Sequence, residues 1–386
     1  MASSRTSSAH GAAGPPSPSY SHSRSPSPTT RSSSKSPTAS SPPTSTWSLP
    51  VPPAGSPAGG NIQIDADHDD GFMTEEEAED VRSTHSITNS ILAYRKIHGR
   101  TFHNFRTETE YWGPNDEAQN DHLDINHQML LMVMDNQLFR APIPRNPQRV
   151  LDVGTGTGIW AIDFADQFPS AEVIGTDLSP IQPVWVPPNC RFELDDAQLP
   201  WSFPDNHFDF IHMRLMMGSI KDWPFLYGEV LRCLKPGGWF EHMDYDPHVY
   251  CDDESISPAS AWHEYGSIFI SAGEKIGRTF NIIIDQANMG WMRDAGFENV
   301  DERRLKLPMG GWPANPKLKE VGRYNLAATE QGLEGFMLYI LTNVHGWNLV
   351  RTQTYIAAVR SELKKRTNHA YYFASVVAVA PPSEHR

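Results

Sequence analysis

The chain of 386 residues contains little cysteine and lacks a long apolar run. Its three cysteines, Cys190, Cys233 and Cys251, show no paired spacing, which argues against a disulfide framework and a zinc cluster. No apolar stretch approaches the roughly 18–20 residues of a membrane-spanning helix. The N-terminus also lacks the apolar core of a signal peptide. We therefore expect an intracellular protein without a membrane contact, and these features do not separate nucleus from cytoplasm.

Acidic residues are absent from the first 60 residues, which hold four Lys or Arg among many Ser, Pro, Thr and Ala. Such a segment offers too little apolar surface to offset its ordering entropy, so the sequence predicts a disordered leader. From Asp65 to Asp80 the charge reverses, with nine acids and no Lys or Arg. We assign residues 1–74 to the leader and this acidic segment. Serines before prolines are candidate sites for proline-directed kinases, although an unregulated leader explains them equally well: Ser17, Ser25, Ser27, Ser36 and Ser41.

Net charge argues against direct nucleic-acid binding. The whole chain carries −14 and the first 60 residues carry +4, so the remainder carries −18. Nonspecific duplex binding depends on neutralising phosphates, which an acidic surface does not do. The remaining length suits one large domain of about 250–300 residues with extensions.

A glycine-rich turn is the most informative feature of the chain. The segment Val150–Trp160 reads as an apolar strand, an acid, a triple-glycine turn and the start of a helix. Glycines permit close approach of a ligand to the backbone, and the helix directs free N–H groups toward it. A second apolar run ends at Asp177, 23 residues after Gly154, where a carboxylate that binds ribose hydroxyls belongs. The spacing predicts a site for an adenosyl cofactor.

Two other adenosyl or phosphate cofactors fit the turn less well. A dinucleotide fingerprint needs glycine at its sixth position, where this chain has Ile159. A P-loop needs lysine, and none occurs between Arg149 and Arg191.

The pattern Asp152-x-Gly-x-Gly-x-Gly158 instead resembles motif I of the class I S-adenosylmethionine-dependent methyltransferases. In that family the acid and the glycine backbone hold the methionine end of the cofactor, and the acid after the second strand holds the ribose. Asp196-Ala197 resembles the element that lies beside the adenine. The resemblance implies S-adenosyl-L-methionine as cofactor, bound by Asp152, Gly154, Thr155, Gly156, Gly158, Asp177, Leu178, Asp196, Ala197 and His212.

Alternating strands and helices between residues 150 and 245 predict a doubly wound α/β sheet. Strands are expected at 208–212, after the Pro-Gly-Gly turn at 236–238, at Val300–Leu307 and at Tyr371–Val379. The last two fit the antiparallel hairpin that closes the class I methyltransferase sheet, with the order 3-2-1-4-5-7-6 by resemblance. We predict this Rossmann-like domain over residues 149–386, with helical insertions at about 247–290 and 316–365.

Residues 75–148 are predicted to form an N-terminal helical lid. The sequence indicates a helix over 75–98, loops at 98–104 and 111–117, and a second helix over 117–139, where apolar residues recur at helical spacing.

Flanking motifs resemble the fungal LaeA-like methyltransferases, a family of secondary-metabolism regulators associated with the velvet complex. They are Gly99–His103, Pro114–Glu117, Leu123–His127, Ile211–Arg214, Gly218–Trp223 and Leu307–Trp312. The chain departs from the family at Phe102, where Tyr is frequent, and at His122, where Arg is frequent. The resemblance implies a nuclear protein that works with velvet-domain partners.

Methyl transfer from a sulfonium is an in-line displacement that needs positioning and no metal, and no His or Cys spacing here indicates a metal site. A general base is needed only if the acceptor must lose a proton. His212, Arg214 and Asp244 follow or end the fourth and fifth strands and are the catalytic candidates, although each also suits a structural role. His103 and His127 are expected to order the lid.

Three functions remain open at this point. The first is a regulatory methyltransferase that acts on protein, the second is a small-molecule O- or N-methyltransferase of a biosynthetic pathway, and the third is a cofactor-binding scaffold without turnover. The long Ser-Pro leader favours regulation, and the intact acids and glycines argue against a degenerate scaffold.

Overall fold

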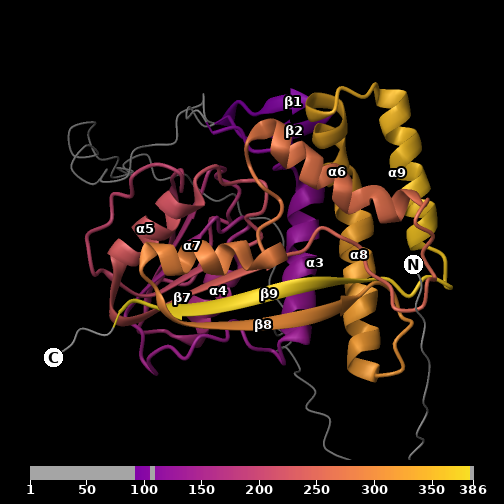
Figure 1. The fold of residues 1–386 in the computed structure, drawn as a ribbon. Coiled ribbons are helices and arrows are strands. Elements are labelled where there is room, and N and C mark those ends of the chain that lie inside the picture. Colours follow the sequence, from indigo (N-terminus) through magenta and orange to yellow (C-terminus); the bar gives the residue numbers. More distant parts are fainter. Residues whose placement is uncertain (1–91, 105–108, 383–386) are drawn as a thin grey trace, which may run out of the picture. The chain divides into compact units, whose positions relative to one another are not determined.

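A seven-stranded sheet forms the centre of the protein in a computed structural model that describes residues 92–104 and 109–382 (Figure 1). The strand order is β5-β4-β3-β6-β7-β9-β8. Strands β3 to β7 pair in parallel, and β9 pairs antiparallel with both β7 and β8. Counted along the chain, this is the predicted order 3-2-1-4-5-7-6, which confirms the fold class. The strands are β3 (Arg149–Val153), β4 (Glu172–Asp177), β5 (Cys190–Leu194), β6 (Phe208–Arg214), β7 (Leu234–Tyr245), β8 (Glu298–Pro308) and β9 (Tyr371–Ala380).

Helices cover both faces of the sheet because successive strand residues point to opposite sides. On β3, Leu151 and Val153 pack in one core cluster with α5 (Trp223–Cys233) and α7 (Ala287–Ala295). Val150 packs on the other face with Trp160 and Phe164 of α4 (Ile159–Gln167). Helix α3 (Glu117–Val133) packs on β7, β8 and β9. This arrangement leaves the carboxyl ends of the parallel strands open for a site.

A second apolar core is built by the helices that the sequence predicted as insertions. It joins α6 (Ala261–Ile276), α8 (Pro316–Tyr339), the π-helical turn η2 (Ile340–Val344) and α9 (Leu349–Leu363). The short helix η1 (Ile284–Gln286) precedes α7. Helix α8 lies beside α3, and α9 lies beside α8 (Figure 1).

The predicted helix over 75–98 is wrong at its end, and residues 75–91 lie outside the described residues. Strands β1 (Arg95–Ile97) and β2 (Arg100–Phe102) form an antiparallel hairpin there. Its two-residue turn has positive φ at His98 (49°) and Gly99 (88°), which suits a tight hairpin. The predicted helix over 117–139 ends at Val133, and positive φ angles follow it at Asp135 and Asn136.

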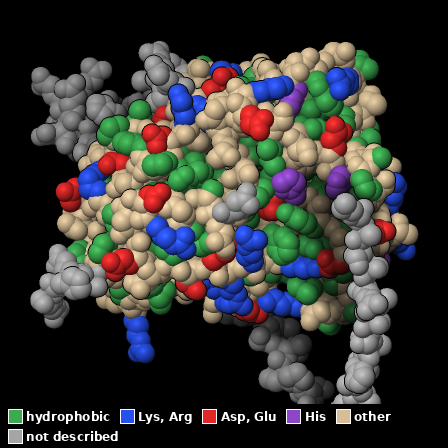
Figure 2. Space-filling model, in the orientation of Figure 1, with side chains coloured by type: hydrophobic (Ala, Val, Ile, Leu, Met, Phe, Trp, Pro, Cys, Tyr) green, Lys and Arg blue, Asp and Glu red, His purple; other side chains and the backbone are tan. Residues whose placement is uncertain are grey.

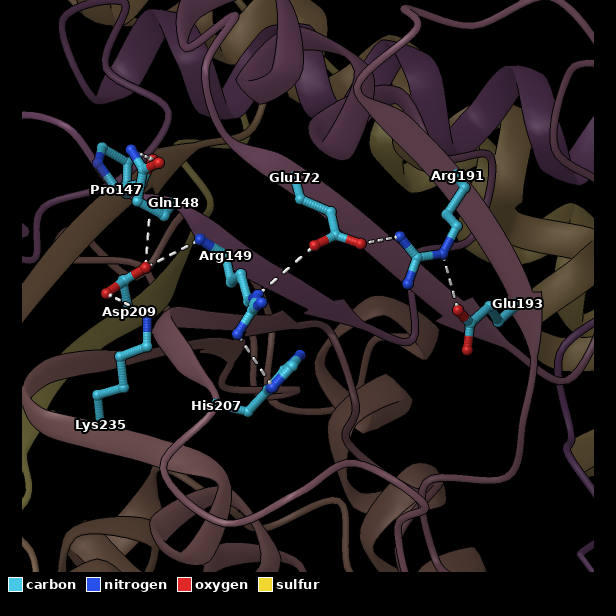
Figure 3. Close-up of polar contacts among 9 residues, drawn as sticks. All are labelled: Pro147, Gln148, Arg149, Glu172, Arg191, Glu193, His207, Asp209 and Lys235. Carbon is cyan, nitrogen blue, oxygen red and sulfur yellow. Dashed lines mark hydrogen bonds and ion pairs between the residues drawn. The ribbon is translucent and has the colours of Figure 1, made fainter.

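Charged side chains connect the amino ends of the parallel strands, opposite the open edge (Figure 3). The carboxylate of Asp209 accepts hydrogen bonds from the backbone N–H groups of Gln148 and Arg149, both at 2.9 Å, and from Lys235 Nζ at 2.9 Å. Glu172 pairs with Arg149 and Arg191. These contacts fix the strand ends, although the exposed ion pairs each contribute little.

Basic residues mark the edge of the sheet formed by β8. Figure 2 shows Lys and Arg side chains gathered over the region of β8, whose exposed residues include Arg303, Arg304 and Lys306. Charged edges discourage pairing with another chain. Within residues 92–104 and 109–382, no helix combines the length and apolar character that crossing a bilayer requires.

Candidate functional site

A cleft opens at the carboxyl ends of β3, β4, β5 and β6, where the strand order reverses direction. Open α/β sheets bind ligands at this position. Its empty volume is about 1100 Å³, open solvent at the mouth included. Predicted site residues that line it are Gly154, Thr155, Gly156, Asp177, Leu178, Asp196, Ala197 and Arg214.

The glycine loop between β3 and α4 forms the floor of the cleft. Gly154, Gly156 and Gly158 all have positive φ, at 68°, 59° and 80°, a conformation that favours glycine. The N–H of Thr155 donates to the carbonyl of Thr176 at 2.9 Å, which ties the loop to β4. A Cβ on Gly154 would lie 2.5 Å from the sulfur of Met216, a residue that also lines the cleft. The loop therefore depends on glycine for both its conformation and its close contacts.

Asp177 at the end of β4 faces the loop. Its Oδ2 accepts a hydrogen bond from the N–H of Gly156 at 2.8 Å, and Oδ1 accepts from the N–H of Ser179 at 2.9 Å. Burial raises the pKa of Asp177 to about 6, and the nearby Asp152 acts in the same direction. The backbone of Leu178 also hydrogen-bonds this carboxylate, which still has acceptor capacity left for a ligand.

Asp196 follows β5 and is 2% exposed. Its Oδ1 accepts from the N–H of Gln198 at 3.0 Å, whereas Oδ2 has no hydrogen-bond partner among the described residues. A buried acceptor without a partner costs free energy unless a ligand supplies a donor. Ala197 lines the cleft beside it.

Asp152 and His212 lie beneath the glycine loop and do not line the cleft. The two residues are opposite each other in the register of β3 and β6, and each is 2% exposed. His212 Nδ1 donates to Asp152 Oδ1 at 2.7 Å, and the hydroxyl of Thr155 donates to Oδ2 at 2.6 Å. The His212 ring stacks on Trp160, with centroids 3.7 Å apart. This geometry supports the structural alternative for His212, because its ring is enclosed by the loop, β3 and α4.

Asp244 is also enclosed, whereas Arg214 reaches the cleft. Asp244 is fully buried, and its Oδ2 accepts from the N–H of Met216 at 3.0 Å. Arg214 Nη1 donates to His127 Nδ1 at 3.0 Å, and His127 Nε2 donates to Asp163 at 2.9 Å. Asp244 thus supports the turn after β6 and does not face a ligand. Gly158 is the N-cap residue of α4 and does not line the cleft.

Several cleft residues were not predicted from the sequence. Tyr111 and Asn115 precede α3, Ser179 follows β4, and Met216 follows β6. The side chain of Asn115 donates to the hydroxyl of Ser179 at 3.3 Å, which joins the segment before α3 to the sheet. Tyr111 and Asn115 fall inside or beside motifs noted above, but their contact with the cleft depends on how α3 packs.

The chain is similar to known methyltransferases and to a regulator of secondary metabolism. The family described as a methyltransferase domain matches residues 125–302. "Methyltransferase pytC" from Aspergillus terreus is 38% identical over 299 residues, 77% of this chain and 91% of that protein. "Secondary metabolism regulator laeA" from Monascus pilosus is 37% identical over 287 residues, 74% of this chain and 77% of that protein. "Protein-methionine methyltransferase laeA" from Emericella nidulans is 35% identical over 292 residues, 75% of this chain and 77% of that protein.

Proposed function

Because the chain belongs to the LaeA-like family of S-adenosylmethionine-dependent methyltransferases, we propose that it is a nuclear regulator of fungal secondary metabolism and development. One observation carries the proposal: relatives named as secondary metabolism regulators match about three quarters of the chain. The chain is an enzyme whose methyl donor is S-adenosyl-L-methionine. The regulatory role, the nuclear site and velvet-domain partners are the parts that we propose.

The cleft suits this cofactor chemically. Asp196 Oδ2, which has no partner among the described residues, can accept a hydrogen bond from the adenine amino group. Asp177 can accept hydrogen bonds from the ribose hydroxyls. The backbone of Gly154 and Gly156 lines the cleft, and we propose that it contacts the methionine end of the cofactor. The carboxylates also suit a cofactor that carries a positive sulfonium. We propose that Thr155, Leu178 and Ala197 complete the contacts, and that Asp152, Gly158 and His212 act by shaping the loop.

We propose that the protein accelerates methyl transfer mainly by positioning the acceptor against the methyl group. The bound cofactor supplies an activated methyl group. A near-attack arrangement of acceptor and methyl contributes roughly 7–11 kcal/mol of barrier lowering. Among the described residues, Arg214 is the only Lys or Arg that lines the cleft, and we propose that it pairs with the cofactor's carboxylate. Its contact with His127 fixes the direction of the guanidinium.

Deletion of the gene in its own fungus tests the regulatory proposal. We expect several chemically unrelated families of metabolites to fall together, and we expect the wild-type gene to restore them while the Asp177→Ala gene does not. A tagged wild-type chain should accumulate in the nucleus and co-purify with a velvet-domain protein. Loss of a single compound family would instead show a pathway methyltransferase, and full restoration by Asp177→Ala would show a scaffold.

A further inference from the structure

A second cavity adjoins the cofactor cleft, and aromatic rings form a large part of its wall. We call it the aromatic cavity; its wall includes Trp112, Phe269, Phe336 and Tyr372. Residues shared with the cofactor cleft are Tyr111, Gln119, Leu123, Asn126 and Leu215. Because the two spaces share these walls, a group in the aromatic cavity lies next to a cofactor in the cleft.

The aromatic cavity favours a neutral, flat occupant. No Lys or Arg belongs to its wall in the described part of the chain. Its one carboxylate, Asp246, already accepts hydrogen bonds from His248 Nδ1 at 2.8 Å and from the hydroxyl of Tyr250 at 2.6 Å. A charged group would lose its hydration there without a partner. Ring faces and edges stack well against another aromatic ring.

His122 presents a free acceptor nitrogen to this cavity. The residue is on α3, and its Nδ1 donates to the carbonyl of Ala328 on α8 at 2.8 Å. That bond places the ring proton on Nδ1, because a carbonyl can only accept, and so Nε2 keeps its lone pair. Burial lowers the pKa of His122 to about 4, so the ring is neutral at physiological pH. Phe336 packs edge-on against it with centroids 4.7 Å apart, which holds the ring in place.

Two other residues of the cavity wall, Gln119 and Trp112, each hold a buried polar atom without a partner. Gln119 precedes His122 by three residues on α3, so both side chains lie on one helix face. Its Oε1 is buried without a partner, and so is the indole N–H of Trp112. Gln119 Oε1 lies beside Gly335 on α8, which is outside the cavity wall, so His122 Nε2 is the acceptor that suits a hydroxyl group here.

We propose that the aromatic cavity is the acceptor site, that it takes a neutral aromatic ring bearing a hydroxyl group, and that His122 Nε2 receives the hydroxyl proton. The proposal rests on the methyltransferase function above and names its acceptor class. The ring belongs either to a free phenol or to a tyrosine side chain of a protein.

The transfer step balances without a further reactant. A lone pair of the hydroxyl oxygen forms the new C–O bond with the methyl carbon, and the C–S bond breaks with its electron pair passing to sulfur. Because His122 is a weak base, the hydroxyl proton moves to its Nε2 only as the C–O bond forms and the oxygen becomes strongly acidic; the proton then passes to solvent. The products are an aryl methyl ether and S-adenosylhomocysteine. A positioned proton acceptor of this kind contributes about 10²–10⁴-fold to rate.

Binding without the cofactor gives the first test. Calorimetry compares 1-naphthol with 1-methoxynaphthalene, which lacks the hydroxyl proton. We expect wild-type protein to bind the naphthol about tenfold more tightly, and we expect His122→Asn to reduce that ratio to about twofold or less. Asn keeps an amide donor for the Ala328 carbonyl, and circular dichroism checks the fold. His345→Phe is the matched control, because its ring also bonds a backbone carbonyl, that of Ile268, but lines neither cavity.

Turnover gives the second test. We expect His122→Asn to lose roughly 10²–10⁴-fold in kcat on 1-naphthol but far less on 4-nitrophenol, whose more acidic hydroxyl depends less on a base. Methylation of a tyrosine peptide in place of naphthol would assign the ring to a protein. Equal binding of naphthol and its ether by wild-type protein would overturn the proposal. If S-adenosylmethionine still binds in that case, the methyltransferase function stands; if it does not bind, that function fails as well.

Discussion

Asp177 holds its carboxylate between the backbone N–H groups of Gly156 and Ser179. The same oxygens face the cleft, so this residue both fixes the glycine loop and presents an acceptor to a ligand. Its raised pKa, about 6, follows from burial and from the neighbouring Asp152. The charge on the cleft therefore changes within an experimentally accessible pH range.

We predict that the affinity for S-adenosylmethionine falls as the pH is lowered from 7 to 5. Above about pH 6 Asp177 is ionised and binds hydroxyl donors and the positive cofactor well; below it the carboxyl is protonated, and a neutral hydrogen bond replaces a charged one. That difference is about 1 kcal/mol, or roughly fivefold in Kd. Calorimetric titrations at the two pH values measure it. Asp177→Asn should show a flatter profile, and a wild-type profile as flat as that of the variant would contradict the assignment.

The sequence predicted the positions of some site residues in the cleft but not of others. Asp177 ends β4 and Asp196 follows β5, and the carboxyl ends of these strands meet at one edge, so the place of both residues in the cleft could be predicted. Asp152 and His212 also belong to parallel strands, but strand register places them opposite each other under the loop. His122 could not be assigned from the sequence, because its role depends on the packing of α3 against α8.

At the scale of elements, the loop from β3 to α4 combines conformation and close packing. Its glycines have positive φ, which costs another residue about 1–2 kcal/mol. At Gly154 a side chain would also displace Met216 within the cleft. Gly277 at the end of α6 separates the effect of backbone strain from that of the close contact. Its φ, 67°, is nearly that of Gly154, but no atom lies near its missing Cβ.

We predict that Gly154→Ala and Gly277→Ala each lower the free energy of unfolding by about 1–2 kcal/mol. Only Gly154→Ala should weaken S-adenosylmethionine binding, by tenfold or more, because Met216 must move inside the cleft. Denaturant unfolding and calorimetry measure the two effects. Normal cofactor affinity in Gly154→Ala would show that the loop does not contact the ligand.

Helices and strands with a regular spacing of apolar residues could be predicted from the sequence, whereas turns and element ends were harder to predict. The order of the seven strands followed from the motif sequence and its resemblance to a family. The hairpin of β1 and β2 was missed because strands of three residues give no clear alternation, and His98-Gly99 was the one available turn signal. The C-terminal end of α3 was misplaced by apolar residues that pack after the helix has ended, such as Leu138.

At the scale of the whole molecule, two apolar cores build different parts of the site. The sheet core builds the cofactor cleft, and the core formed by α6, α8, η2 and α9 contributes much of the wall of the aromatic cavity. Segments 64 or more residues apart meet between them, as when Asn115 contacts Ser179 and His122 contacts Ala328. The sequence predicted both sets of elements, but the cavity between them arises only from their packing.

Calorimetric titration of S-adenosylmethionine into wild-type protein, Asp177→Ala and the control Asp252→Ala tests the central claim most directly. Asp252 pairs with Lys306 at the surface, outside the cleft. Loss of one or more charged hydrogen bonds, each about 1.5–3 kcal/mol, should raise the Kd of Asp177→Ala by roughly 10–150-fold while circular dichroism stays unchanged. Asp252→Ala should bind like wild type. Unchanged affinity in a folded Asp177→Ala protein would contradict the account.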